Sequence, residues 1–476
     1  MSWSLSRALL LRGLGGVYVV AFLVLARQHR ALFGHEGLTP ADGFLARVGE
    51  ELGAEAYTRL PTIFWVDASD GALATAAWVG VAGAAAMVAG CGNSVLIGAL
   101  WALYLSFVHV GQAWYGYGWE TLLLEAGFLA IFLGSPTRWR PTSPPSWVVL
   151  LLYRWLLFRL MLGAGLIKLR GDDCWRDLTC LVHHYETQPN PNPLSLWFHR
   201  LPYPVHGVGV LWNHVVELVV PWLLLGPRPA RTFAGVITGV FQVTLILSGN
   251  LAFLNWLTLV LCVACLDDGT LGRFFRRSPE PDPPAPARRW VVGALAALVA
   301  VKSVEPVENL LSPAQAMNAS FDPLHLVNTY GAFGSVGRER LELVIEGTDD
   351  GETWYAYELP CKPTDPARRP CWISPYHLRL DWQMWFAAQQ PLEQHPWLVH
   401  LVRKLLRGDP AVRDLLARDP FPGPPPWKVR VDRYVYAFAE PGDAAWWTRR
   451  RVGSVIRPVE VDDPGLVEAV RHFGWD

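Results

Sequence analysis

A series of long apolar segments fills the first two thirds of the chain and limits how it can fold. A helix needs about 20 mostly apolar residues to cross the hydrocarbon core of a bilayer. Segments that approach this length lie at about 8–26, 73–91, 94–112, 117–134, 147–168, 207–226, 233–249, 251–267 and 289–304. The sequence therefore predicts an α-helical polytopic membrane bundle of about nine spans, formed by residues 1–304.

The composition supports a membrane protein. Charged residues make up 17% of the chain, against about 25% in typical soluble domains. The net charge of -1 gives no reason to expect a nucleic-acid partner, and membrane lipid is the expected partner instead. Basic residues are nearly all arginine, and alanine, glycine and proline are abundant, which favours a GC-rich genome and a bacterial source.

Residues 305–476 have the pattern of a soluble α+β domain with a β-rich core. Apolar residues alternate over 341–345, and a turn at 349–351 leads into a second, aromatic strand. Helical spacing follows over 396–417, and strand character returns over 429–436. We therefore expect a second domain after the last span.

Arginines in the short connecting loops predict the orientation of the chain, because cytoplasmic loops are enriched in positive charge. With the N-terminus in the cytoplasm, the segments on the cytoplasmic side hold Arg7, Arg138, Arg140, Arg228, Arg231, Arg273, Arg276, Arg277, Arg288 and Arg289. The loops near 27–72 and 169–206 then lie outside, and so does the domain at 305–476. Outside means the periplasm in a bacterium, or the lumen of the endoplasmic reticulum in a eukaryote.

The cysteines agree with this orientation. Four of the seven fall in segments expected outside, namely Cys174, Cys180, Cys361 and Cys371. Each pair could close a small loop in an oxidising compartment, so we predict disulfides Cys174–Cys180 and Cys361–Cys371, with four free thiols as the alternative. Cys262 and Cys265 have the spacing of a redox motif, but they lie in an apolar helix and are expected to be packed.

The segment at 147–168 carries three charges, Arg154, Arg159 and Lys168. A charge near the bilayer centre costs about 2.5–3.5 kcal/mol on insertion scales, so these side chains should face protein or a wet cavity. Helical geometry places Arg154 and Lys168 on one face and Arg159 on another. Four residues in neighbouring spans are candidate partners and could line a polar pocket: Glu120, Glu125, His214 and Glu217.

Two interpretations of Lys168 stay open. A lysine removed from water in a pocket can lose its proton and act as a base. Alternatively, Lys168 is structural and lies within about 4 Å of Glu120, Glu125 or Asp172. We expect the second arrangement, because Lys168 ends its span and Asp172 follows one helical turn later.

No other sequence motif predicts a catalytic or ligand-binding site. His183 and His184 lack the i, i+4 spacing of a zinc-binding helix, so no metal is predicted. The glycines at 331–337 do not form a dinucleotide-binding pattern. No phosphate-binding P-loop or nucleophile-elbow motif occurs, and no cofactor is expected.

Several blocks of the sequence closely resemble the lipase maturation factor family. They are Arg159–Asp172 (RLMLGAGLIKLRGD), Cys174–Cys180 (CWRDLTC), His184–Pro193 (HYETQPNPNP), Gly249–Leu257 (GNLAFLNWL), Val327–Gly334 (VNTYGAFG) and Cys371–Phe386 (CWISPYHLRLDWQMWF). The resemblance covers about 115–476. It implies a multi-pass protein of the secretory-pathway membrane that helps secreted dimeric lipases to fold and assemble.

A shorter block, Ala164–Trp175, is similar to the vitamin K-dependent carboxylase family and its bacterial relatives. In that family a lysine at the position of Lys168 is implicated as the base that starts quinol oxygenation. This resemblance implies an alternative function, an intramembrane carboxylase- or oxygenase-like enzyme that uses Lys168.

The leading hypothesis is a membrane-embedded maturation factor for exported proteins such as lipases. The loop at 169–206 and the domain at 305–476 would contact the client protein. Such a factor needs adaptable apolar surface and no catalytic group, so an enzyme is the less favoured alternative.

Overall fold

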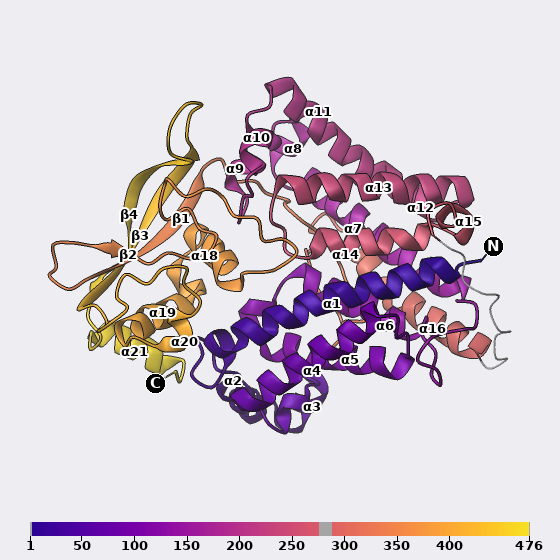
Figure 1. Ribbon diagram of the computed structural model, residues 1–476, viewed down its shortest axis with the longest axis horizontal. Helices are drawn as coiled ribbons and strands as arrows, with labels where there is room; N and C mark the ends of the chain where they lie inside the picture. The colour runs from indigo at the N-terminus through magenta and orange to yellow at the C-terminus, as the bar shows by residue number, and fades with distance from the viewer. Residues whose placement is uncertain (1, 276–287, 476) are drawn as a thin grey trace.

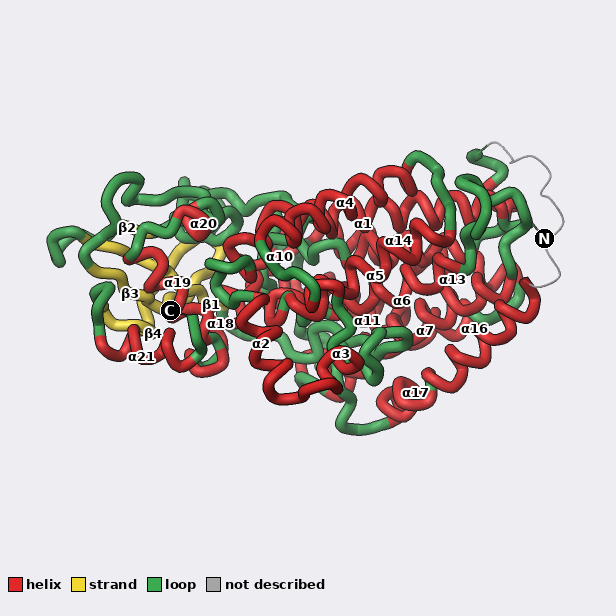
Figure 2. Tube along the Cα trace, turned by 90° about the horizontal axis from the view of Figure 1, so that it is seen from below, coloured by secondary structure: helices red, strands yellow, loops and turns green. Residues whose placement is uncertain are grey.

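The computed structural model describes residues 2–275 and 288–475. Arg276, Arg277 and the rest of the proline-rich connector up to residue 287 lie outside the described residues. The molecule is elongated, with a helical bundle at one end and a β-sheet with its helices at the other (Figures 1 and 2). The N-terminus lies at the far end of the bundle, and the C-terminus lies beside the sheet (Figure 1).

Each apolar segment forms a helix. These are α1 (Ser4–Phe33), α4 (Asp70–Val88), α5 (Ser94–Val110), α6 (Gly118–Ile131), α7 (Trp147–Arg170), α11 (Tyr203–His214), α12 (Val220–Leu224), α13 (Arg228–Ser248), α14 (Leu254–Cys262) and α16 (Arg288–Lys302). A π-helical turn at Val215–Val219 joins α11 to α12. Shorter helices lie between and after them: α2 (Ala41–Leu52), α3 (Ala56–Arg59), α8 (Asp173–Arg176), α9 (Leu181–Thr187), α10 (Ser195–His199), α15 (Asp268–Leu271) and α17 (Val304–Leu311).

The predicted helical membrane bundle is confirmed, but the count of about nine spans is not. Among the described residues, six helices are long and apolar enough to cross a membrane: α1, α4, α7, α11 with α12, α13, and α16 with α17. The helices α5 and α14 are apolar but shorter, and α6 has only 14 residues. At 1.5 Å per residue, α6 spans about 21 Å, which is less than the hydrocarbon core of about 30 Å.

The β-rich character of the C-terminal part is confirmed. Four antiparallel strands form one sheet in the order β2-β1-β3-β4. The strands are β1 (Arg340–Thr348), β2 (Tyr355–Ala356), β3 (Lys428–Phe438) and β4 (Trp447–Val459). The sheet is accompanied by α18 (Arg379–Gln389), α19 (Pro396–Leu406), α20 (Pro410–Arg413) and α21 (Pro464–His472). The expected hairpin at 349–351 joins β1 to β2, with Gly347 opposite Tyr355.

One hydrophobic core runs through both parts. Buried residues of α1, α5, α6 and α7 belong to the same packed cluster as those of α18, α19 and β3. Residues that are far apart in sequence therefore share one interior, and the sheet lies against the bundle (Figure 2).

Two glycines of α7 let the segment after α17 pack closely. Gly163 and Gly171 are two helical turns apart, and a Cβ atom at either position would overlap a backbone carbonyl oxygen, that of Tyr330 or that of Gly334. The segment at 330–334 therefore lies directly against α7. This close approach places its polar groups within reach of charges in the bundle.

Candidate functional site

Lys168 lies at the C-terminal end of α7 in a closed cluster of polar groups. Its ammonium nitrogen is 2.5 Å and 2.7 Å from the two carboxylate oxygens of Glu217, and 3.3 Å from Oδ1 of Asn213. The Trp175 ring lies 5.2 Å from the same nitrogen. Lys168 is 5% exposed, so its charge is neutralised by Glu217 and shielded from bulk solvent.

The π-helical turn positions Glu217. Such a turn inserts an extra residue into a helix and often occurs at functional sites. Nδ2 of Asn213 donates to Glu217 at 3.0 Å and holds the carboxylate toward Lys168. His214, one of the predicted pocket residues, lies on the same helix and reaches the edge of the cluster through Trp175, since its Nε2 is 2.9 Å from the carbonyl oxygen of Trp175.

The expected ion pairing of Lys168 is present, and its partner is Glu217, one of the four candidate partners. The narrower expectation of Glu120, Glu125 or Asp172 was wrong. Glu120, Glu125 and Asp172 all bind other groups. The helix ends at Gly171, so Asp172 does not continue the helical face of Lys168. Its carboxylate instead accepts from the Cys174 N–H at 2.9 Å and lies 3.5 Å from Nη2 of Arg338.

Arg159 and Glu125 form a buried ion pair between α7 and α6. The segment after α17 completes it. Nη1 of Arg159 donates to the Asn328 carbonyl oxygen at 2.6 Å, while the Asn328 N–H and the Tyr330 hydroxyl donate to Glu125 at 3.1 Å and 2.7 Å. A polar segment from outside the predicted spans thus satisfies charges inside the bundle.

Glu120 of α6 binds a second arginine that comes from the C-terminal part. Nη1 of Arg379 is 2.9 Å from the Glu120 carboxylate, and both side chains are fully buried. The guanidinium stacks over the Tyr115 ring at 3.4 Å, and the Tyr104 hydroxyl donates to Glu120. Gln28 of α1 accepts from the Arg379 N–H at 3.0 Å.

Arg154 does not belong to the Lys168 cluster. It packs against Trp3, with its guanidinium carbon 5.7 Å from the ring centre, at the opposite end of α7. Lys168 follows Arg154 by 14 positions, which separates the two residues by about 21 Å along the helix axis. The shared helix face predicted from the sequence therefore does not bring the two charges together.

A third set of charges joins the sheet to the segment at 186–189. Arg340 of β1 donates to the carbonyl oxygens of Gln188 at 2.6 Å and Glu186 at 2.8 Å. Lys362 donates to the Pro189 carbonyl at 3.2 Å, and both cations contact Glu342. Burial lowers the pKa of Lys362 from its ordinary value, and the nearby Glu342 carboxylate opposes this effect.

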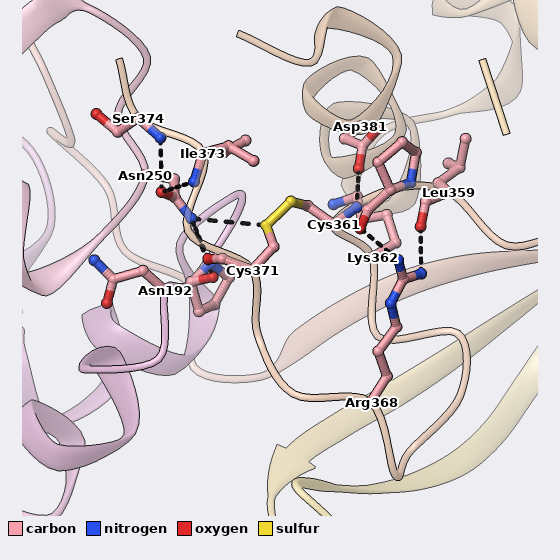
Figure 3. The surroundings of a disulfide bond; sticks show 12 residues. Asn192, Asn250, Leu359, Cys361, Lys362, Arg368, Cys371, Ile373, Ser374 and Asp381 are labelled. Carbon is pink, nitrogen blue, oxygen red and sulfur yellow. Dashed lines mark hydrogen bonds between the residues drawn. A yellow bond between two sulfur atoms is a disulfide. The ribbon is translucent and has the colours of Figure 1, made fainter. Parts of the chain in front are cut away.

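The predicted disulfide Cys361–Cys371 is present, with Cα atoms 5.4 Å apart (Figure 3). Nδ2 of Asn250, between α13 and α14, donates to the Cys371 carbonyl at 2.9 Å. Its Oδ1 accepts from the Ser374 N–H at 3.1 Å (Figure 3). The Asp381 carboxylate accepts from the Cys361 N–H at 2.7 Å, and burial raises its pKa to about 6. The disulfide loop therefore connects the bundle to α18.

The predicted disulfide Cys174–Cys180 is also present, with Cα atoms 4.7 Å apart. It is buried against Val210 and Val336 and holds Trp175 beside Lys168. The remaining cysteines, Cys91, Cys262 and Cys265, are free thiols. Cys262 and Cys265 are buried in the bundle core, as expected from their apolar helix.

The described residues contain no group of three or more histidine, cysteine or acidic side chains placed to hold a metal ion. His184 lies edge-on to the Phe333 ring at 4.8 Å. Burial lowers its pKa to about 4, so its ring is neutral near pH 7.

Comparisons with known proteins identify the family. The model of the lipase maturation factor transmembrane domain matches residues 5–273, and that of the lipase maturation factor C-terminal domain matches residues 326–457. Lipase maturation factor 1 of Bos taurus is 47% identical over 505 residues, covering 96% of this chain and 90% of the relative.

The chain belongs to the lipase maturation factor family. Lipase maturation factor 1 of Homo sapiens is 45% identical over 513 residues, covering 99% of this chain and 90% of the relative. Lipase maturation factor 2 of Homo sapiens is 31% identical over 606 residues, covering 99% and 85%. No solved structure matches the chain.

The sequence blocks that resemble the lipase maturation factor family meet in space. Arg159 contacts the block at 327–334, the carbonyls at 186–189 accept from Arg340 and Lys362, and Asn250 binds the block at 371–386. The blocks thus form one junction between the bundle and the C-terminal part, which we call the charge junction. It comprises Glu120, Glu125, Arg159, Asn250, Asn328, Arg340, Glu342, Lys362 and Arg379.

Of the nine residues of the charge junction, only Glu120, Glu125 and Arg159 were singled out from the sequence. Glu120 and Glu125 were noted as acidic residues in an apolar segment, a signal that buried cations must lie near. No local pattern distinguishes Arg379 or Arg340 from surface arginines, since each pairs with a residue distant in sequence.

We predict that separating the Glu125–Arg159 pair destabilises the protein more than replacing both members. Glu125→Gln leaves a buried, uncompensated guanidinium and should lower the free energy of unfolding by about 3–5 kcal/mol. The double variant Glu125→Gln with Arg159→Met should recover part of this loss. The measurement is reversible unfolding of the full chain in mixed micelles.

The matched control is Arg59→Ala, which removes an exposed ion pair with Glu55. It should change the free energy of unfolding by less than about 1 kcal/mol. Additive losses in the double variant would show that Glu125 and Arg159 do not stabilise each other.

Proposed function

We propose that this chain is a membrane-embedded maturation factor that helps exported proteins, such as secreted lipases, to fold and assemble. The observation that carries the proposal is its family membership. Relatives that are named for lipase maturation are aligned over nearly its whole length. We infer that lipases are the client proteins from the names of those relatives. The chemistry of the described site fits a protein that binds its clients.

We propose that the segment at 169–206 and the domain at 305–476 form the client-facing region. Both lie at the end of the molecule away from the N-terminus, and each contains a disulfide. Disulfides form in oxidising compartments, which supports a position outside the cytoplasm for both segments. Exposed aromatic side chains in these regions include Trp197 and Trp372, which could contact apolar client surface.

Nine crossings fit the arrangement of helix ends. If α5, α6 and α14 cross together with the six longer helices, successive helices alternate in direction. At the N-terminal end of the bundle, Arg7 then contacts Pro141 and Asp268 contacts Ser4. At the opposite end of the bundle, Asn250 contacts Cys371. An odd number of crossings places the two ends of the chain on opposite sides of the membrane. Because the disulfide Cys361–Cys371 supports a position outside the cytoplasm for the C-terminal part, the N-terminus is then cytoplasmic.

Reporter fusions test this orientation. We expect a reporter that is active only in the cytoplasm to be active when fused after Phe275 and inactive when fused after Asp476. A reporter that needs an oxidising compartment should show the reverse. Cytoplasmic activity at Asp476, in a fusion that still inserts into the membrane, would contradict the proposed topology.

The alternative of an intramembrane carboxylase- or oxygenase-like enzyme finds no support in the surroundings of Lys168. A lysine base must present a neutral amine with a free lone pair. Here both carboxylate oxygens of Glu217 and Oδ1 of Asn213 lie within hydrogen-bond distance of the Lys168 nitrogen, so its donor positions are occupied by protein groups. This arrangement supports a structural role for Lys168.

Secretion of an active lipase tests the function. In cells that lack endogenous lipase maturation factors, coexpression of this chain should raise the activity of a secreted dimeric lipase per unit of lipase protein. Lys168→Arg keeps the positive charge and the contact with Glu217 but cannot easily lose a proton. We therefore expect it to retain most of the activity.

Lys302→Arg is the matched control, because Lys302 likewise ends an apolar helix, α16, but pairs with Asp322 at 4.0 Å instead of Glu217. Lipase activity at the level of empty vector, with the chain well expressed and inserted, would contradict the lipase client. Loss confined to Lys168→Arg at unchanged expression would instead favour the enzymatic alternative.

A further inference from the structure

A small basic pocket opens at the N-terminal end of the bundle, opposite to the charge junction. It lies between the first turns of α1, the α4–α5 turn and the loop after α6, and has a volume of about 150 Å³. Its charged lining residues are Arg7, Arg12 and Arg140, and its apolar lining includes Leu11 and Met87. None of the residues that line it is acidic.

Arg7 is built into the wall of this pocket. It is 6% exposed, and its guanidinium donates to the carbonyl oxygens of Pro141, at 2.9 Å, and Ser143. Arg288 donates to Pro144 O of the same loop at 2.7 Å. These contacts fix the loop after α6 against α1, so the pocket is part of the folded bundle.

Arg12 and Arg140 carry charge that the described part of the chain leaves unpaired. Within residues 2–275 and 288–475 neither guanidinium forms an ion pair or a side-chain hydrogen bond. Two described carboxylates at this end of the bundle, Asp267 and Asp268, are already bound by other groups. Asp268 accepts from the Ser4 and Leu5 N–H groups at 2.9 Å each, and Asp267 pairs with Arg228 and Arg231.

Glycines keep the floor of the pocket free of side chains. Gly90 has a φ of +99°, and a Cβ atom there would lie 2.9 Å from Nη2 of Arg12. A Cβ atom at Gly92 would lie 2.7 Å from Cγ of Pro141. The backbone of the α4–α5 turn therefore approaches the arginines closely and leaves room for a small ligand.

We infer that this pocket binds a phosphate group, and specifically the phosphate headgroup of an anionic membrane lipid. Guanidinium groups match the geometry of phosphate oxygens, and basic pockets between transmembrane helices bind lipid headgroups. The pocket volume is about that occupied by five molecules of liquid water. That space accommodates a phosphate group, while Leu11 and Met87 provide apolar surface for the start of an acyl chain.

The free thiol of Cys91 provides a probe within the wild-type chain. Cys91 lines the pocket and is half-buried, whereas Cys262 and Cys265 are buried in the core. Alkylation of Cys91 by N-ethylmaleimide is measured in lipid discs of phosphatidylcholine alone, of phosphatidylcholine with phosphatidylglycerol, and of phosphatidylcholine with added inorganic phosphate. Protection in the second disc identifies a lipid headgroup, and protection by inorganic phosphate identifies a free phosphate ligand.

Variants that remove arginines distinguish lipid binding in the pocket from a general attraction of anionic lipid to the positively charged surface. Arg12→Gln with Arg140→Gln should weaken phosphatidylglycerol binding about 30-fold, or roughly fivefold for each arginine near an anionic lipid surface. The control, Arg273→Gln with Arg289→Gln, removes two exposed arginines near the same end that do not line the pocket. In this control, phosphatidylglycerol should protect Cys91 from alkylation as it does in the wild type.

Two results would overturn the proposal. One is equal alkylation of wild-type Cys91 in all three preparations. The other is equal loss of protection in the two double variants, which would assign lipid attraction to the general positive potential of this end. Because the first comparison uses the unmodified protein, it stands even if the Arg12 and Arg140 variant folds poorly.

Discussion

Buried charge is the constraint on which the rest of this structure depends. Removing a carboxylate from water costs several kcal/mol unless an opposite charge and hydrogen bonds compensate it. The bundle buries Glu120 and Glu125 on α6, and only one of their two arginine partners, Arg159, lies in the bundle. The other, Arg379, comes from the start of α18. Glu120 therefore has its arginine partner only when the C-terminal part is docked against the bundle.

The docked domain in turn fixes the segment that follows α7. Arg340 and Lys362 bind the carbonyls at 186–189, while the disulfide Cys174–Cys180 packs beside the Lys168–Glu217 pair. The two regions proposed to contact clients are therefore held together and to the membrane domain. If these regions contact clients as proposed, they present one fixed surface beside the membrane domain.

The sequence predicts the elements better than their pairing. Apolar segments locate the helices, and the alternation at 341–345 locates β1, because these signals are local. The partner of Lys168 depends on the helix end at Gly171 and on the π-helical turn that presents Glu217. The glycine is a recognisable helix-stop signal, but the π-helical turn has no clear local pattern. Arg379 could not be assigned to Glu120, since only the folded chain brings α18 next to α6.

Hydrogen–deuterium exchange in Glu120→Gln tests most directly whether buried charge holds the two parts together. The variant leaves Arg379 buried without a carboxylate partner. Faster exchange is expected both in α18 and at 112–117, where Arg379 stacks on Tyr115, while exchange in α16 stays unchanged. The exposed variant Glu55→Gln should alter neither region. Unchanged exchange in α18, with faster exchange confined to α6, would contradict the claim that this ion pair docks the C-terminal domain.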